Sequence, residues 1–248
     1  MTAELEALTA EIVSCRLCPR LVAWREQVAT EKRASFSDED YWGRPVPGWG
    51  DPDAALIVVG LAPAAHGANR TGRMFTGDRS GDWLYRAMYE AGFANQPDST
   101  AVEDGLELHD AWVTAPVRCA PPQNKPETTE RDNCAEWFHR ELDLLGSARV
   151  FVALGQYAYV SLWRYLGASM VLPRPRPRFA HGEEIPLADG RTVLLSFHPS
   201  QQNTFTGRLT REMLAAVFAR ARDLTALHRA DRDSAPNGGV RRPGRDRG

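Results

Sequence analysis

The four cysteines of this 248-residue chain are the residues whose number and spacing point most directly to chemistry. Cys15 and Cys18 form a C-x2-C pair, and Cys119 and Cys134 are separated by fourteen residues further along the chain. Four thiolates from two distant segments can bind zinc or hold an iron–sulfur cluster, and spacing alone does not separate the two. Free buried cysteines and disulfides are the alternatives, although nothing in the sequence suggests secretion. We predict a four-cysteine metal site that joins the N-terminal helices to the domain.

A second candidate region is the loop at residues 60–78, which contains four glycines, Gly60 among them. Glycine allows the backbone to approach a ligand closely. Phe75 lies in this loop between polar and glycine residues, where it can stack on a planar ligand or fill space beneath the loop. Asp78 can orient a water molecule or cap the following helix. His66 and Asn69 can line the site or stabilise the loop.

The third candidate region is the loop that begins with His198-Pro199-Ser200. A histidine at a strand end can donate a hydrogen bond to negative charge that develops in a reaction, or it can be satisfied by local backbone. The loop continues with polar side chains suited to phosphates and base edges, namely Gln201, Asn203 and Arg208. An exposed polar turn is the alternative for that run.

The elements that position these residues alternate between strands and helices. Short apolar runs predict strands at residues 55–59, 111–116, 149–154 and 192–197. Helices are predicted at residues 3–13, 19–29, 127–144, 156–166 and 209–227, with a further helix capped by Ser80. This alternation indicates an α/β fold with a parallel sheet covered on both faces. Ligands of such sheets bind beyond the carboxyl ends of the strands, where the loops at 60–78 and 198–210 begin.

Composition adds few constraints. The formal charge is −2, but residues 229–248 carry six Arg and three Asp, so this segment is basic and the rest is acidic. We predict one domain over residues 1–228 and a disordered basic tail over 229–248, which either attracts phosphates weakly or has no role. No apolar run is long enough to cross a membrane, and we expect a cytoplasmic protein.

Together, residues 60–78, 118–126 and 198–200 and the four cysteines resemble the uracil-DNA glycosylase superfamily, most closely its family 5. The resemblance covers residues 15–227 and implies a three-layer α/β/α sandwich around a four-stranded parallel sheet. It also implies a structural 4Fe–4S cluster, rather than zinc, on Cys15, Cys18, Cys119 and Cys134. The implied partner is damaged double-stranded DNA, bound by a monomer that excises uracil, hypoxanthine and other deaminated bases.

The resemblance also implies roles for individual residues. Phe75 stacks on the flipped base, Asn124 contacts the base, His198 polarises the base carbonyl and Asp78 orients water. Gly60 and Ala62, with His66 and Asn69, belong to the implied substrate pocket. Two departures from the wider superfamily are shared with family 5: residues 61–65 contain no carboxylate, and Ala115 replaces an asparagine that reads pyrimidines.

Two other functions stay open at this stage. The first is a binder of deaminated DNA that does not turn over or that traps DNA covalently. The second is a metal-bearing nucleotide enzyme unrelated to repair, against which the loop at 60–78 lacks both the G-x-G-x-x-G pattern and a phosphate-loop lysine.

Overall fold

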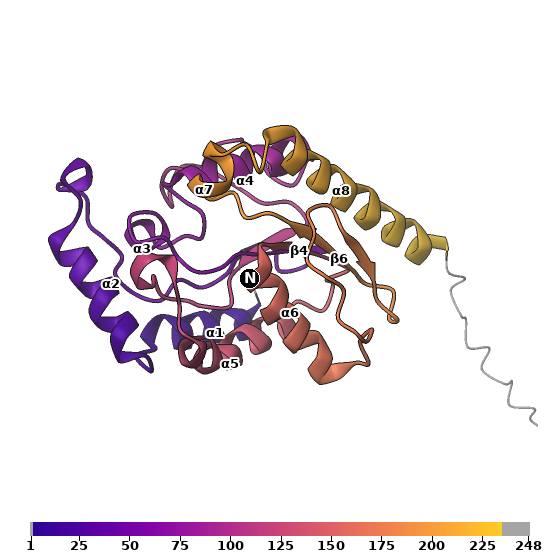
Figure 1. The fold of residues 1–248 in the computed structure, drawn as a ribbon, viewed down its shortest axis with the longest axis horizontal. Coiled ribbons are helices and arrows are strands. Elements are labelled where there is room, and N and C mark those ends of the chain that lie inside the picture. The colour runs from indigo at the N-terminus through magenta and orange to yellow at the C-terminus, as the bar shows by residue number, and fades with distance from the viewer. Residues whose placement is uncertain (1, 235–248) are drawn as a thin grey trace, which may run out of the picture.

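A central six-stranded sheet separates two layers of helices in the computed structural model, which describes residues 2–234 (Figure 1). The strand order is β1-β3-β2-β4-β6-β5. The four inner strands are parallel, and they are β2 (Leu56–Val59), β3 (Ala111–Thr114), β4 (Val150–Leu154) and β6 (Thr192–Ser196). The two edge strands are antiparallel to their neighbours, and they are β1 (Trp49–Gly50) and β5 (Glu184–Pro186).

Each inner strand is buried on both faces, which explains its unbroken apolar sequence. Successive side chains of a strand point to opposite faces, so β2 serves two cores. Leu56 and Val58 pack in one core with α4 (Arg79–Glu90) and α8 (Arg211–Ser234). Ile57 and Val59 pack in the other core, beneath α1 (Ala3–Ser14), α5 (Thr128–Leu144) and α6 (Gln156–Ser169). The result is the predicted three-layer α/β/α sandwich (Figure 1).

The remaining elements lie in the loops or outside the two layers. They are α2 (Pro19–Glu31), η1 (Ala34–Phe36), α3 (Ala68–Thr71), η2 (Pro122–Asn124) and α7 (Gln201–Phe205). The helix α2 begins directly after Cys18, because Pro19 at its first position fixes a helical φ and needs no hydrogen-bond acceptor.

The prediction of four strands was incomplete. All four predicted strands are present and parallel, but the edge strands β1 and β5 were missed. Two or three residues are too few for a periodic pattern, so pairing with a neighbour, and not local sequence, creates these strands. The short helices α3 and α7 were missed for the same reason, since they contain four and five residues.

Two helix boundaries also differ from the prediction. Asp78, and not Ser80, caps α4, because its carboxylate accepts hydrogen bonds from the backbone N–H groups of Ser80 and Gly81. The last helix begins at Arg211 and continues to Ser234, past the predicted end at Leu227 and into the segment predicted as a tail. The rest of that segment, residues 235–248, lies outside the described residues. No helix between residues 2 and 234 is both long and apolar enough to cross a membrane.

Candidate active site and metal centre

The carboxyl ends of the inner strands bring together two of the predicted loops. Gly60 follows β2, and Gly155 follows β4 in the neighbouring position of the sheet. The rings of Phe75 and His198 stack, with their centroids 5.8 Å apart and an interplanar angle of 29°. Both glycines lie against this pair: a β-carbon on Gly60 would meet the Phe75 ring at 2.7 Å, and one on Gly155 would meet the His198 Cβ at 3.3 Å. Gly60 therefore makes room for an aromatic side chain of the protein itself.

Phe75 adopts a backbone conformation that aromatic residues rarely occupy, with φ at +55°. Its neighbours hold it there. The Tyr85 hydroxyl donates to the Met74 carbonyl at 2.6 Å, and Arg73 Nε donates to the Thr76 hydroxyl at 2.9 Å. Arg73 is itself buried in an ion pair with Asp104 at 2.7 Å. Such strain persists where the surroundings enforce it, and it is concentrated at functional sites.

The residue His198 as a whole is only partly exposed, and burial of its imidazole ring lowers its pKa to about 4. The ring is therefore neutral at physiological pH, with one N–H donor and one acceptor nitrogen. The backbone of this residue is fixed by Asn203, whose Nδ2 donates to the His198 carbonyl at 2.9 Å. Asn203, predicted to contact DNA, thus has a positioning contact inside the protein.

Asp78 contacts the helix that follows it. One carboxylate oxygen accepts from Ser80 N at 2.9 Å and from Gly81 N at 3.0 Å. Burial raises the pKa of this carboxyl, and the two backbone donors lower it in part. A β-carbon on Gly81 would lie 1.8 Å from the Phe75 carbonyl oxygen, so the turn that Asp78 caps packs directly on the backbone of Phe75. The geometry supports the capping alternative and gives Asp78 an indirect hold on Phe75.

The other predicted residues of the first loop have different surroundings. Asn69 is fully buried, and its Nδ2 donates to the Arg25 carbonyl at 3.2 Å, which supports the loop-stabilising alternative. His66 is partly exposed and its Nδ1 lies 3.0 Å from the Tyr41 hydroxyl. Burial and two nearby arginines lower the pKa of His66. Both residues tie the loop to the N-terminal segment.

Three further predicted residues are spread over the strand ends. Ala115 follows β3 and is buried in the same core as Phe75. Ala62 is half-buried and packs against a buried hydrophobic cluster that includes Cys18, Cys119 and Cys134. Asn124 is exposed at the end of η2, with φ at +56°, so its side chain is at the surface and not in a packed pocket. A contact between Asn124 and a base remains a prediction.

The loop after His198 presents an aromatic side chain that our sequence reasoning did not select. Phe205 on α7 is 64% exposed, and the Arg79 guanidinium lies 4.3 Å from the centre of its ring. Gln201 and Arg208 are exposed nearby in sequence, and Arg208 stacks on Phe197. The signal available in the sequence was a single aromatic residue in the otherwise polar run of residues 201–208.

The four cysteines line one cavity, which confirms that the two distant segments meet. Cys18, Cys119 and Cys134 are buried and Cys15 is partly exposed. Cys15 and Cys18 flank the junction of α1 and α2, whereas Cys119 follows β3 and Cys134 lies in α5. A buried ion pair fixes the last two segments relative to each other, since Arg118 contacts Glu141 of α5 at 2.8 Å.

Burial raises the pKa of Cys119 to about 11 and that of Cys134 to about 12. These thiols do not ionise near neutral pH without added positive charge. Buried N–H and O–H groups around the cysteines lack acceptors among the described residues, and they belong to Arg25 (Nε), Trp137 (Nε1) and Tyr157 (hydroxyl). A metal centre that binds the thiolates and carries acceptor sulfurs of its own would satisfy both demands. Between residues 2 and 234, no three Cys, His, Asp or Glu side chains are grouped to bind a single metal ion.

Comparison with known proteins agrees with this architecture. Residues 47–222 match the model of the uracil DNA glycosylase superfamily. The chain is 53% identical over 221 residues to a type-5 uracil-DNA glycosylase of Mycobacterium bovis, covering 89% of this chain and 81% of the relative. It is 51% identical to that of Thermus thermophilus, covering 90% and 99%, and 46% identical to that of Pyrobaculum aerophilum, covering 85% and 88%. The chain therefore belongs to the uracil-DNA glycosylase superfamily, on its type-5 branch.

Proposed function

We propose that this protein hydrolyses the N-glycosidic bond of uracil in DNA and leaves an abasic site, as the first step of base excision repair. The observation that carries the proposal is the stacked Phe75–His198 pair at the carboxyl ends of the strands, in a chain half identical to type-5 uracil-DNA glycosylases. The pair offers a flat apolar face and a hydrogen-bond donor side by side, which is what a planar base with an exocyclic oxygen requires.

His198 would stabilise the departing base. Breaking the glycosidic bond leaves positive charge on the sugar and negative charge on the base, and an enzyme can stabilise both without a nucleophile. Because the pKa of His198 is about 4, the ring would act as a neutral hydrogen-bond donor to the base oxygen. The constrained backbone of Phe75 would hold its ring where the base stacks.

The target base must first leave the duplex, which costs a few kcal/mol and least at a mismatch. Phe205 is suited to fill the gap, since it is exposed, aromatic and backed by Arg79. Gln201 and Arg208 would contact the neighbouring backbone. The absence of a carboxylate from residues 61–65 leaves more room than a charged residue would, which supports hypoxanthine and other deaminated bases as further substrates.

In this proposal water can attack the sugar by two routes, with Asp78 as the group that orients it or without any base. Asp78 carries a buried carboxylate, but one of its oxygens is already occupied by backbone donors of α4. The second oxygen faces Gly67, where an added β-carbon would approach it to 2.1 Å. Asp78 would thus orient water only through this second oxygen, and otherwise the positive sugar would capture water without a base.

We further propose that Cys15, Cys18, Cys119 and Cys134 hold a 4Fe–4S cluster. The donor set is four sulfurs around one cavity, which suits iron and zinc alike. The resemblance to family 5, together with four cysteines around one cavity, favours the cluster over zinc in this proposal. When bound, the group would supply cohesion between α2, the end of β3 and α5, because hydrolysis of a glycosidic bond transfers no electron.

The test is strand cleavage, after alkali treatment, of labelled duplexes that carry one G·U, G·hypoxanthine or A·U pair. Cleavage of the uracil duplexes is expected, fastest at G·U because the mismatched base leaves the stack most easily. Failure of a folded, brown protein to cleave any duplex or single strand would refute the enzyme. A covalent complex that survives denaturing electrophoresis would instead favour a DNA trap. The same reactions at increasing protein concentration would test whether a monomer suffices.

A further inference from the structure

Arg25 of α2 is a buried cation in direct contact with a cysteine sulfur. Only 2% of this residue is exposed. Its Nη1 donates to Cys119 Sγ at 2.8 Å, and its Nη2 donates to the carbonyl oxygen of Cys15 at 3.2 Å. One side chain therefore contacts both of the segments that carry the cysteines.

The protein supplies little negative charge to this guanidinium. Its nearest carboxylate is that of Glu26, 3.9 Å from Nη2, and this carboxylate already forms a two-pronged pair with Arg16 at the surface. Arg25 Nε has no acceptor in the described part of the chain. A buried cation without a close counter-charge is strongly destabilising. The anionic partner of Arg25 must come from the cysteine side, where its guanidinium already points.

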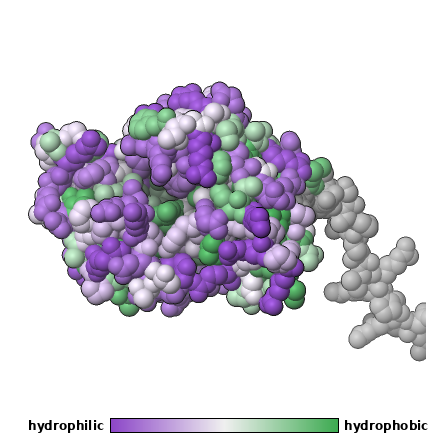
Figure 2. Space-filling view, viewed as in Figure 1, coloured by the Kyte–Doolittle hydropathy of each residue, from purple (hydrophilic) through white to green (hydrophobic). Residues whose placement is uncertain are grey.

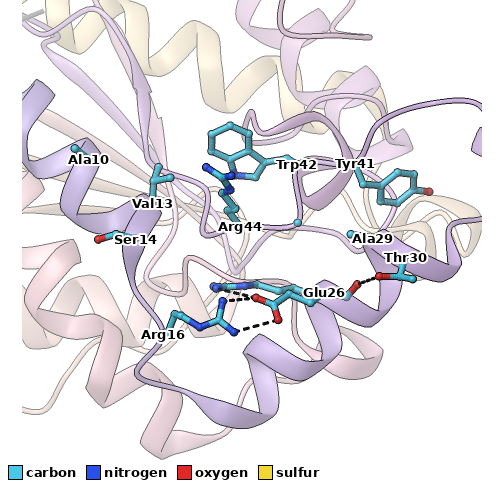
Figure 3. Close-up of a pocket in the computed structure, with 12 residues that line it drawn as sticks. Ala10, Val13, Ser14, Arg16, Glu26, Ala29, Thr30, Tyr41, Trp42 and Arg44 are labelled. Carbon is cyan, nitrogen blue, oxygen red and sulfur yellow. Dashed lines mark hydrogen bonds and ion pairs between the residues drawn. The ribbon is translucent and has the colours of Figure 1, made fainter.

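Arg25 also lies between two cavities. It lines the cysteine cavity, and it lines an open cleft on the other side, between α1, α2 and residues 41–44. Figure 3 shows this cleft, with Trp42 and Arg44 on one wall and, on the opposite wall, Glu26 of α2 paired with Arg16 from the segment before that helix. Arg25 is thus part of the partition between the open cleft and the cysteine cavity.

We propose that Arg25 is a positioning residue for the cluster, which donates a hydrogen bond to the Cys119 ligand and closes the cysteine site from the cleft. The inference rests on the proposed cluster. Hydrogen bonds and positive charge at a ligand sulfur stabilise the more negative, reduced form of a cluster and raise its reduction potential. The bulk of the side chain limits the access of water, oxygen and chelators from the cleft.

Three variants separate the two effects. Arg25→Met keeps most of the length but removes the donor and the charge, so the midpoint potential of the cluster should become more negative. Arg25→Ala should shift the potential in the same direction and also open the partition. Arg25→Lys retains the charge, and its potential should lie closer to wild type. Arg220→Met is the matched control, because Arg220 is also a helical arginine, but it lies on α8 and its guanidinium pairs with Glu184 at the surface.

The measurements are a spectroelectrochemical titration of the purified holoprotein and the decay of absorbance near 400 nm in an iron chelator. Loss of outer contacts to metal ligands typically costs about 10- to 100-fold in metal affinity. We expect cluster loss about tenfold faster in Arg25→Met, faster again in Arg25→Ala, and unchanged in Arg220→Met. A potential and a decay rate equal to wild type in Arg25→Met would overturn the inference.

The iron content of the wild-type protein separates the role of Arg25 from the proposed cluster on which it rests. A wild-type protein that carries no iron would refute the cluster itself. An iron-bearing wild type with an unaltered Arg25→Met variant would refute only the role of Arg25. If Arg25→Met does not fold, a wild-type-like potential and decay rate in Arg25→Lys with faster decay in Arg25→Ala would still support the role.

Discussion

The cysteine cavity and the loops at the strand ends differ in how their residues are used. All four cysteines line one cavity, although two come from the segment before α2, one follows β3 and one lies in α5. The polar residues of the loops diverge instead: Asp78 caps a helix, Asn69 is buried against α2, and Asn124 is exposed. A cysteine has few structural roles besides packing, whereas a carboxylate or amide has many backbone partners to choose from. Spacing is therefore more informative for thiols than for loop polar groups.

The two regions are nevertheless connected. Ala62 of the first loop packs against the buried side chains around three of the cysteines. Asn69 of the same loop donates a hydrogen bond to the carbonyl oxygen of Arg25. Figure 2 shows a face on which hydrophilic residues cover most of the area and hydrophobic residues form smaller areas. We expect damage at the cysteine region to reach the loop as a loss of stability, whereas loss of the His198 side chain should affect chemistry alone.

The largest effect is expected for Cys119→Ser. The variant loses one of the four proposed cluster ligands at a buried position, so iron, the absorbance near 400 nm and cohesion between α2 and β3 should all be lost. Each kcal/mol shifts the melting temperature of a domain of this size by roughly 2–4 °C, and we expect a fall of several such steps. Iron analysis and thermal unfolding measure it. Unchanged melting after iron loss would mean that the metal contributes nothing to the fold.

Glu141→Gln tests the scaffold behind the cysteines. The change leaves the buried guanidinium of Arg118 without its carboxylate, and breaking a buried pair in this way costs about 3–5 kcal/mol. Urea unfolding should register that loss with an unaltered slope. The control is Arg140→Met, which removes an exposed pair with Glu11 and should leave the midpoint unchanged. Equal midpoints in the two variants would contradict a special role for the buried pair.

His198→Ala should act in the opposite manner. One preorganised donor to developing charge is typically worth about 3–4 kcal/mol, so kcat should fall by roughly a hundredfold or more. Melting and iron content should stay close to wild type, because the residue as a whole is partly exposed and its side chain forms no ion pair within residues 2–234. His109→Ala is the control, since it removes an exposed histidine elsewhere. A wild-type rate in His198→Ala would mean that His198 is not the hydrogen-bond donor to the departing base.

Asp78 distinguishes capping from catalysis. Asp78→Asn keeps a side-chain oxygen for the N–H groups of Ser80 and Gly81, whereas Asp78→Ala loses the cap at a cost of about 0.5–2 kcal/mol. If Asp78 only positions Phe75, the asparagine variant should retain most activity and the alanine variant should lose part of it along with stability. An inactive but stable Asp78→Asn would identify the carboxylate as the group that orients water.

The sequence predicted the layers, the four inner strands and the meeting of the cysteines, because apolar periodicity and thiol spacing are local signals. It did not predict what holds Phe75 in place. Arg73, Asp104 and Tyr85 lie far apart in the chain and form that support only after folding. Nor did it reveal Arg25, since a single arginine in an amphipathic helix resembles any surface cation until its burial is known. Pairing between distant residues, and not propensity, determines these features.

The last effect is the pH dependence of stability that His198 contributes. Burial lowers its pKa from 6.5 to about 4 in the folded protein, so the folded state resists protonation. Above about pH 6.5 both states hold a neutral ring and the contribution is constant. As the pH falls from there towards 4, the unfolded chain takes up a proton that the folded chain does not, and stability decreases. Wild type should therefore lose more stability than His198→Gln between about pH 7 and pH 5, as measured by urea unfolding. Parallel losses in the two proteins would mean that the ring is not desolvated in solution, and the neutral donor proposed for the departing base would then be partly protonated in mildly acidic buffer.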